Sequence, residues 1–186
     1  MLVGFFASPP SSVLPAFSPT RKRASKVMPI SFLKGSIFKS DSQVLVCPVN
    51  TRGVAGAGLA LQFKDRFPAQ IDYYRKSCRA RLLKPGQVLV DPESMDDDPV
   101  ILFAATKDDW RSPSRSQWVN DCIDGINIFI IDHPQFTLVS IPALGCGLGR
   151  LSWPAIKRRM LSTLDQTVRN RPDLQINVFE PGHKPA

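Results

Sequence analysis

Apolar residues from position 30 onward recur with the periods of strands and helices. Val44–Val49 is almost continuously apolar, which is typical of a strand buried on both faces of a sheet. Leu59, Phe63 and Phe67 recur every four residues and predict a helix with one buried stripe. The same criteria predict further strands at 30–33, 87–90, 100–105, 137–141 and 176–179. They predict further helices from Pro68, from a Ser114 cap to Ile131, and from a Ser152 cap, the last with a buried stripe of Ile156, Met160, Leu164 and Val168.

Strands that alternate with helices through short loops predict an α/β fold with a largely parallel central sheet. In such folds, ligands bind beyond the carboxyl ends of the strands. The two loops richest in glycine follow predicted strands at that edge, one at 50–58 and the other at 142–149. Their glycines are Gly53, Gly56, Gly58, Gly145, Gly147 and Gly149.

These two loops have the composition of a nucleotide-binding edge. Glycine permits positive φ angles and a close approach of the backbone to a ligand. Amides at the helix start after the first loop favour an anion, and bare N–H groups in the second loop suit a diphosphate. Neither loop is a Walker or dinucleotide-binding motif, because the required lysine and acidic residue are not at the required spacing. Tight strand-to-helix turns also need glycine, so a purely structural role stays open.

Residues 1–29 differ in composition from the remainder of the chain. They are rich in serine and proline and hold four basic residues and no acidic one, which predicts a disordered extension before a domain at 30–181 and a tail at 182–186. The basic residues follow the apolar part, unlike those of a secretory signal. A transit peptide, or a translation start at Met28, remains an alternative.

Charge and cysteine usage narrow the class of protein. The net charge is +8, and a basic surface favours polyanions such as nucleic acid, although solubility alone explains it equally well. No apolar run approaches the length of a membrane-spanning helix. The four cysteines form no C-x-x-C pair and the chain has two histidines, so we expect neither a metal nor a cofactor. A reduced, cytoplasmic protein fits this composition.

Three segments of the sequence resemble a known family. Asn50–Pro68 and Ile141–Trp153, with Gly-Val-Ala-Gly-Ala-Gly and Gly-Cys-Gly-Leu-Gly at their centres, resemble the macrodomains, which bind ADP-ribose. The segment 105–115 resembles the Thr-Lys-x-x-Trp-Arg-x-x-Ser-Arg stretch of the DNA ADP-ribosyl glycohydrolase antitoxins, which remove ADP-ribose from thymine bases. The resemblance runs from about residue 30 to 181 and implies a three-layer α/β/α fold with a mixed, largely parallel sheet.

The resemblance implies a cleft for ADP-ribose with Lys107 as the catalytic lysine. Lys107 would end a strand at the ligand edge, where it could stabilise charge near the anomeric carbon or form a Schiff base with the opened sugar. Without the resemblance, a solvated lysine at a strand end is the simpler interpretation. The ligand-binding residues implied are Ser36, Ile37, Asn50, Gly53, Val54, Gly56, Gly58, Gly145, Cys146, Gly147, Leu148 and Gly149. Asn50 would reach the distal ribose, and 145–149 would hold the diphosphate.

Several positions depart from the pattern of the family. Ser36 stands where related domains commonly have an aspartate for the adenine amino group, and Cys47 stands where many have asparagine. Gly149 stands where the human terminal ADP-ribose glycohydrolase type has a catalytic aspartate, which the DNA-directed type also lacks.

Trp110, Arg111 and Ser114 are candidate contacts to the nucleobase or to DNA. Packing of their own loop is the alternative role for Trp110 and Arg111.

The predicted function is therefore hydrolysis of the bond between ADP-ribose and thymine in DNA. One alternative is a module that binds ADP-ribose without turnover. Another is a hydrolase of ADP-ribose 1-phosphate or O-acyl-ADP-ribose. The expected partners are single-stranded DNA and a separate ADP-ribosyltransferase toxin, with no membrane.

Overall fold

A computed structural model describes residues 29–182 of the chain, so the predicted extension up to residue 28 and the residues from 183 onward lie outside it. Its centre is a six-stranded sheet in the order β1-β6-β5-β2-β4-β3. Every neighbouring pair is parallel except β3 and β4, which run antiparallel. The strands are β1 (Ile30–Leu33), β2 (Val44–Asn50), β3 (Val88–Val90), β4 (Val100–Lys107), β5 (Leu138–Pro142) and β6 (Gln175–Phe179).

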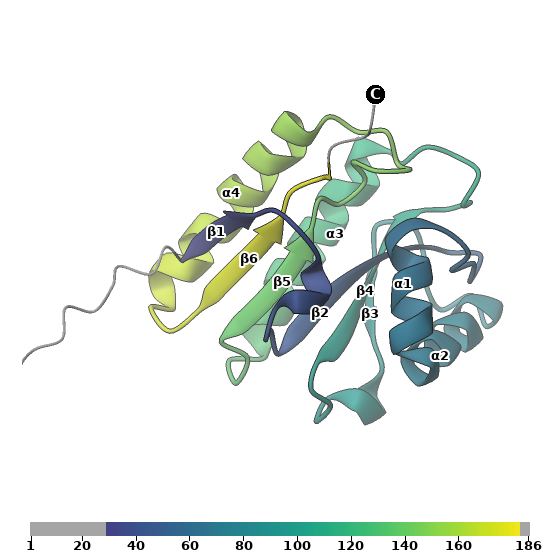
Figure 1. Cartoon of the computed structure of the whole chain (residues 1–186), viewed down its shortest axis with the longest axis horizontal. Coiled ribbons are helices and arrows are strands. Elements are labelled where there is room, and N and C mark those ends of the chain that lie inside the picture. The colour runs from purple at the N-terminus through teal and green to yellow at the C-terminus, as the bar shows by residue number, and fades with distance from the viewer. Residues whose placement is uncertain (1–28, 183–186) are drawn as a thin grey trace, which may run out of the picture.

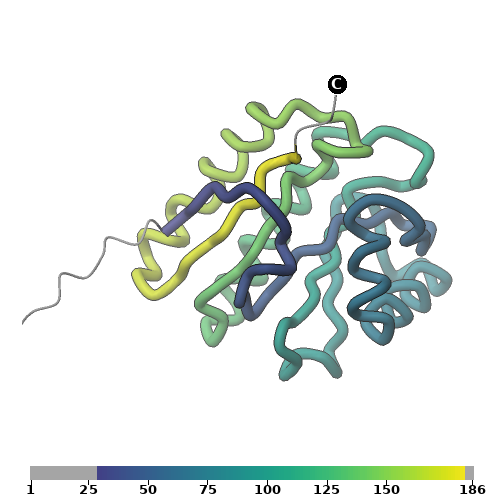
Figure 2. Tube along the Cα trace, viewed as in Figure 1, coloured from purple at the N-terminus to yellow at the C-terminus, as the bar shows by residue number. Residues whose placement is uncertain are grey.

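Helices cover both faces of the sheet, which gives three layers (Figure 1). The helices are α1 (Gly58–Arg66), α2 (Pro68–Arg79), α3 (Ser116–Asp132) and α4 (Trp153–Asn170), with short 3₁₀ helices η1 (Ile37–Lys39) and η2 (Pro92–Ser94). The trace in Figure 2 shows β1 and β6, from the two ends of the domain, side by side at one edge of the sheet. The prediction of an α/β fold with a mixed, largely parallel sheet is confirmed.

The core consists of two apolar clusters, one on each face of the sheet. In β2, Val44 and Val46 point to the side of α3 and α4, whereas Leu45 and Cys47 point to the side of α1 and α2. Because successive side chains of a strand alternate between faces, a strand covered by helices on both faces must be apolar throughout. This explains the continuous apolar run of the sequence.

Helix starts differ from the prediction in local detail. The stripe of α4 is buried as predicted. Ser152 occupies the N-cap position of α4, but its side chain makes no capping hydrogen bond. The predicted Ser114 cap is wrong, because α3 begins at Ser116 with Arg115 as its N-cap residue. The backbone N–H of Ser114 donates instead to the Gly149 carbonyl at 3.0 Å, so a contact with the second glycine-rich loop decides its place.

The stripe of Leu59, Phe63 and Phe67 also spans two elements. Phe63 is buried within α1, but Phe67 lies at the junction between α1 and α2. Proline lacks a backbone N–H and is tolerated in the first turn of a helix, so Pro68 opens a new helix there. Within residues 29–182, no helix is long and apolar enough to cross a membrane.

Candidate functional site

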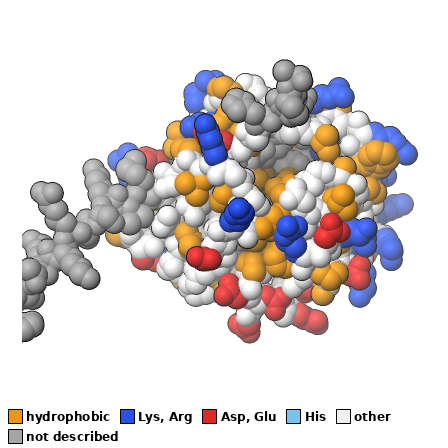
Figure 3. Space-filling view, in the orientation of Figure 1, with side chains coloured by type: hydrophobic (Ala, Val, Ile, Leu, Met, Phe, Trp, Pro, Cys, Tyr) orange, Lys and Arg blue, Asp and Glu red, His pale blue; other side chains and the backbone are white. Residues whose placement is uncertain are grey.

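A cavity of about 880 Å³ lies at the carboxyl edge of the parallel strands. Its walls come from the segments that follow β1, β2, β4, β5 and β6, so strands far apart in the sequence contribute to one site. Figure 3 shows the hollow, with hydrophobic side chains inside it and Lys and Arg side chains near its rim. The prediction that both glycine-rich loops meet at this edge is confirmed.

Most of the predicted site residues line this cavity. They are Ser36, Ile37, Asn50, Val54, Gly56, Gly58, Lys107, Trp110, Ser114, Gly145, Cys146, Gly147, Leu148 and Gly149. Gly53 and Arg111 are not part of the lining. Gly53 has a φ of +75°, and a Cβ built on it would lie 3.3 Å from the Cβ of Cys78, so this glycine serves the turn and its packing on α2.

The first loop, residues 50–58, is held in shape by the Asn50 carboxamide. Its Nδ2 donates to the Val54 carbonyl at 2.7 Å, and its Oδ1 accepts from the N–H groups of Arg52 and Val54 at 3.0 and 3.3 Å. The hydroxyl of the buried Tyr74 donates to the Asn50 carbonyl at 2.8 Å. Burial raises the pKa of Tyr74, which keeps this hydroxyl protonated as a donor. The loop is therefore shaped before any ligand enters.

Helix α1 presents its N-terminus to the cavity. Its N-cap residue is Ala57, which offers no side chain to cap the first turn. Gly58, Leu59 and Ala60 of that first turn line the cavity. The unsatisfied N–H groups of a helix start carry partial positive charge and favour an anion.

The second loop, residues 142–149, presents bare backbone to the cavity. The N–H groups of Gly147, Leu148 and Gly149 donate to no backbone acceptor among the described residues. A Cβ built on Gly149 would collide with the Gly145 carbonyl and the Ser114 hydroxyl, so only glycine fits there in this loop conformation. A run of free N–H groups in a tight loop forms a site for phosphate oxygens.

Cys146 lines the same loop as a neutral thiol. Burial raises its pKa to about 11, and its Sγ lies 3.4 Å from the Leu144 carbonyl. A thiol with this pKa is almost fully protonated at neutral pH and is a weak nucleophile. The residue therefore contributes its size and backbone to the cavity wall.

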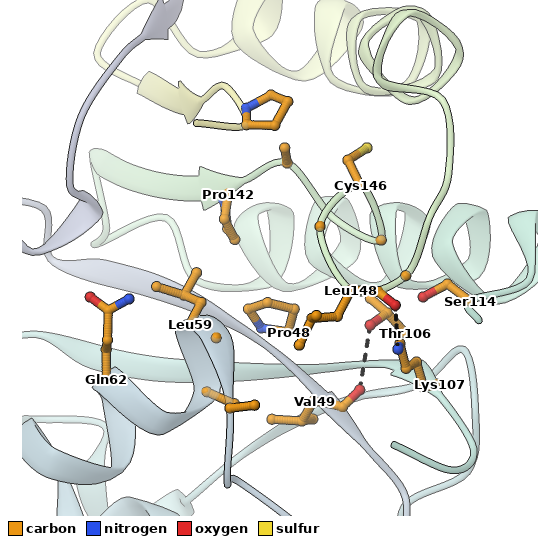
Figure 4. Close-up of a pocket in the computed structure, with 18 of the residues that line it drawn as sticks. Pro48, Val49, Leu59, Gln62, Thr106, Lys107, Ser114, Pro142, Cys146 and Leu148 are labelled. Atoms are coloured by element: carbon orange, nitrogen blue, oxygen red, sulfur yellow. Dashed lines mark hydrogen bonds between the residues drawn. The ribbon is translucent and has the colours of Figure 1, made fainter. Parts of the chain in front are cut away.

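Lys107 ends β4 directly beside Asn50, its partner in the register of β2 and β4. Its Nζ donates to the Leu148 carbonyl at 2.7 Å, across the cavity mouth (Figure 4). Partial burial, and then the nearby Arg150 guanidinium, lower the pKa of Lys107. No described carboxylate lies within ion-pair distance of Lys107. The adjacent Asp108 pairs with Arg52 at 3.4 Å. Lys107 therefore lines the cavity with an amine whose neutral fraction is higher than that of an ordinary lysine.

Two departures from the family pattern have different consequences in the structure. Cys47 is fully buried on the α1 and α2 side of the sheet and is not part of the cavity lining. Ser36 does line the cavity, where its hydroxyl accepts the Phe38 N–H at 3.4 Å as the cap of η1. The serine departure therefore changes the wall of the site, and the cysteine departure changes only the packing behind it.

The comparisons with known proteins agree with this geometry. The Macro domain family model matches residues 46–160. This chain is a macrodomain. The Mycobacterium tuberculosis protein named DNA ADP-ribosyl glycohydrolase is 31% identical over 82% of this chain, and the Thermus aquaticus protein of the same name is 31% identical over 84%. A Thermosipho africanus protein, named a DNA ADP-ribosyl transferase-DNA ADP-ribosyl glycohydrolase fusion, is 28% identical over 83%. The chain spans 42% of the length of each of these relatives.

Solved macrodomains of two of these species superpose on almost their full length. The macrodomain of M. tuberculosis DarG has a TM-score of 0.75 and 30% identity, covering 84% of this chain and 99% of that structure. The macrodomain of T. aquaticus DarG has a TM-score of 0.73 and 31% identity, covering 82% and 98%. These matches confirm the three-layer α/β/α fold.

One wall of the macrodomain cavity escaped the sequence analysis. Phe179, Glu180 and Pro181, at the end of β6, line the same cavity as Ser36 and Ile37, which follow the neighbouring strand β1. Glu180 pairs with Lys157 at 3.0 Å, and this hydrogen bond holds the pKa of the carboxyl below its usual value. The available signal was topological: any strand parallel to β2 ends at the ligand edge, including the last one in the chain.

Within residues 29–182, no group of three or more His, Cys, Asp or Glu side chains is placed to hold a metal ion.

Proposed function

We propose that this macrodomain is a hydrolase that releases ADP-ribose from thymine bases in DNA, with Lys107 as its catalytic residue. The single observation that carries the proposal is the placement of Lys107, whose amine meets the cavity between both glycine-rich loops with a lowered pKa. The names of the relatives from M. tuberculosis and T. aquaticus support the same reaction class.

The cavity offers a matching contact for each part of ADP-ribose. The free N–H groups of residues 147–149 and the uncapped start of α1 suit the diphosphate. The wall of Ser36, Ile37 and Phe179 suits the adenine, with serine as a neutral hydrogen-bond partner. Asn50 and Lys107, side by side at the ends of β2 and β4, then meet the distal ribose.

The Lys107 amine has two routes to cleavage, and its lowered pKa raises the fraction of the neutral form that both routes use. In the first, the amine takes a proton from the water that attacks the anomeric carbon, and the thymine departs with the electron pair of the glycosidic bond. The ammonium then gives that proton to the thymine nitrogen. In the second, the amine bonds to the anomeric carbon as the thymine leaves with the electron pair and takes one proton of the amine. The ring C–O bond then breaks, the remaining N–H proton passes to the ring oxygen, and water hydrolyses the resulting Schiff base. Both routes return a free amine and release ADP-ribose.

The proposal is tested with a single-stranded oligonucleotide that carries one ADP-ribosylated thymidine. We expect wild-type protein to release ADP-ribose and Lys107→Ala to lose about a thousandfold in rate, the range for removing an acid–base group. Calorimetry should show ADP-ribose affinity within about threefold of wild type, because affinity rests on many other contacts. Borohydride reduction during turnover traps a covalent adduct only if the second route operates.

Other substrates provide the outcomes that would replace this proposal. Wild-type protein that binds ADP-ribose but cleaves no substrate is a binding module. Faster turnover of ADP-ribose 1-phosphate or O-acyl-ADP-ribose than of modified DNA would assign the site to those compounds. Full activity of Lys107→Ala on modified DNA would remove the lysine from the chemistry.

We further propose that a DNA ADP-ribosyl transferase supplies the substrate. The T. africanus relative, which carries both activities in its name, supports this pairing. Co-expression with such a transferase should leave DNA free of ADP-ribose in cells with wild-type protein and modified in cells with Lys107→Ala.

A further inference from the structure

A strip of aromatic and cationic side chains leads away from the Lys107 end of the cavity. Trp110 lines the cavity and is 48% exposed. The Arg111 guanidinium lies 4.4 Å from the centre of the Trp110 ring, and the Arg115 guanidinium lies 4.7 Å from the centre of the Trp118 ring. Both arginines are exposed. These four residues are termed the Trp110–Trp118 strip.

The strip is fixed to the cavity by the second glycine-rich loop. Ser114, in the middle of the strip segment, is 6% exposed, and its N–H donates to the Gly149 carbonyl at 3.0 Å. Arg150 follows Gly149, is exposed, and lies near enough to Lys107 for its charge to act on the amine. The strip and Arg150 therefore lie near Lys107, the residue that the proposed function places at the distal ribose.

Two carboxylates, Asp108 and Asp109, lie next to this part of the mouth, and both pair with Arg52, at 3.4 and 3.8 Å. Asp109 also accepts the Arg111 backbone N–H at 2.9 Å. No described carboxylate lies within ion-pair distance of Arg111, Arg115 or Arg150. Three further acidic residues, all exposed, lie in the turn at 96–98, at the amino end of β4 and outside the cavity lining. Figure 3 shows Asp and Glu side chains along the lower margin of the molecule. Guanidinium groups that stack on indole rings and form no ion pair with a described carboxylate fit a ligand that is both anionic and aromatic.

We propose that the Trp110–Trp118 strip, together with Arg150, binds the single-stranded DNA on either side of the ADP-ribosylated base. The proposal rests on the proposed function and adds the polymer contacts to it. An exposed indole stacks on an unpaired base, and guanidinium groups contact phosphates. A duplex hides its base faces, and an acidic peptide would use the arginines but leave the indole without a stacking partner.

Binding of an unmodified oligothymidylate of about twelve nucleotides to the full chain tests the strip without any catalysis. We expect Trp110→Ala to weaken binding about tenfold and Trp110→Phe to restore most of it, because phenylalanine keeps a stacking face. Arg115→Gln should weaken binding about fivefold at low salt and make the salt dependence shallower by one phosphate contact. The matched control is Arg79→Gln on α2, an exposed arginine on the other face of the sheet, which should change neither quantity.

Three results of the binding experiment would overturn the proposal. An equal loss in Arg79→Gln would show that overall charge, and not the strip, holds the DNA. Equally tight binding of the matching duplex would exclude stacking on an unpaired base. Equally tight binding of poly-glutamate would assign the strip to an acidic protein partner.

Turnover separates the failure of the strip from the failure of the proposed function. With ADP-ribosylated thymidine as a free nucleoside, Arg115→Gln should match wild type. With the same group inside an oligonucleotide, its KM should rise about fivefold and its kcat should stay unchanged. If wild type hydrolyses both substrates and Arg115→Gln raises neither KM, the strip is wrong and the hydrolase stands. If wild type hydrolyses neither, the hydrolase is wrong, and the binding experiment still decides the strip.

Discussion

The two glycine-rich loops face the same cavity but reach their shapes by different means. The first loop is held by a side chain, because the Asn50 carboxamide makes three hydrogen bonds to the backbone of Arg52 and Val54. The Tyr74 hydroxyl in turn donates to the Asn50 carbonyl. The second loop contains no such side chain, although Lys107 of β4 donates to its Leu148 carbonyl, and its shape depends on close packing at Gly145 and Gly149. The first loop, residues 50–58, is termed the frame. The second loop, residues 142–149, is termed the cradle, because the N–H groups of residues 147–149 remain free for a ligand.

This comparison explains why one glycine pattern has two physical meanings. In the first loop, the Asn50 carboxamide takes up the N–H groups of Arg52 and Val54, so these two donors are not available to a ligand. In the second loop, the successive N–H groups of Gly147, Leu148 and Gly149 donate to no backbone acceptor within the described part of the chain, and all three residues line the cavity. The cradle should therefore be the more sensitive of the two loops to an added methyl group.

The largest expected effect is that of Gly149→Ala on ADP-ribose binding. Its new Cβ would collide with the Gly145 carbonyl and the Ser114 hydroxyl, so the cradle must open. We expect an affinity loss of about a hundredfold, in line with the cost of overpacking, and a lower melting temperature. Gly147→Ala is the matched control, because a Cβ at this position has no neighbour within 4 Å. Its melting temperature should equal that of wild type. Calorimetry measures the affinity and thermal unfolding measures the melting temperature. Equal affinities and equal melting temperatures of the two variants would contradict the role of close packing at Gly149.

An intermediate effect is expected for Asn50→Ala in the frame. The substitution removes three hydrogen bonds from a residue that is 6% exposed. We expect the free energy of unfolding to fall by about 2 to 3 kcal/mol and ADP-ribose affinity to fall about tenfold. Urea unfolding gives the first quantity and calorimetry the second. A stability equal to that of wild type would mean that the loop keeps its shape without the carboxamide.

The smallest effect concerns the point where the cradle meets the lysine. Partial burial and then Arg150 lower the pKa of Lys107, so its neutral fraction, and with it the proposed rate, rises with pH and levels off below the usual lysine value. Arg150→Asn removes the repulsion by the guanidinium and tolerates the positive φ of that residue. The rise in kcat should then move to higher pH. A shift to lower pH, or no shift, would contradict an electrostatic role of Arg150 on the amine.

Much of the architecture was readable from local patterns. The continuous apolar run of β2 indicated burial on both faces, and the four-residue spacing in α4 placed its buried stripe correctly. Parallel strands then forced both glycine-rich loops and Lys107 to one edge, where the cavity lies. Each of these inferences rests on side-chain periodicity or strand direction, which are properties of the chain itself.

Other features depended on contacts between distant segments. Serine is a common helix N-cap residue, but the Ser114 N–H donates to the Gly149 carbonyl, and α3 begins two residues later. Gly53 matches a ligand-binding motif, yet it packs on α2 away from the cavity. No local pattern carries this information, because the position of such a residue depends on contacts with segments that are distant in the sequence.

The sequence by itself determined the fold, the edge that carries the site and the residue types available there. Only the tertiary structure decided that the Lys107 amine touches the Leu148 carbonyl and that the end of β6 closes the far wall. The physical reason is that periodicity specifies which face of an element is buried, while the pairing of loops across a cavity depends on packing between elements separated by many residues.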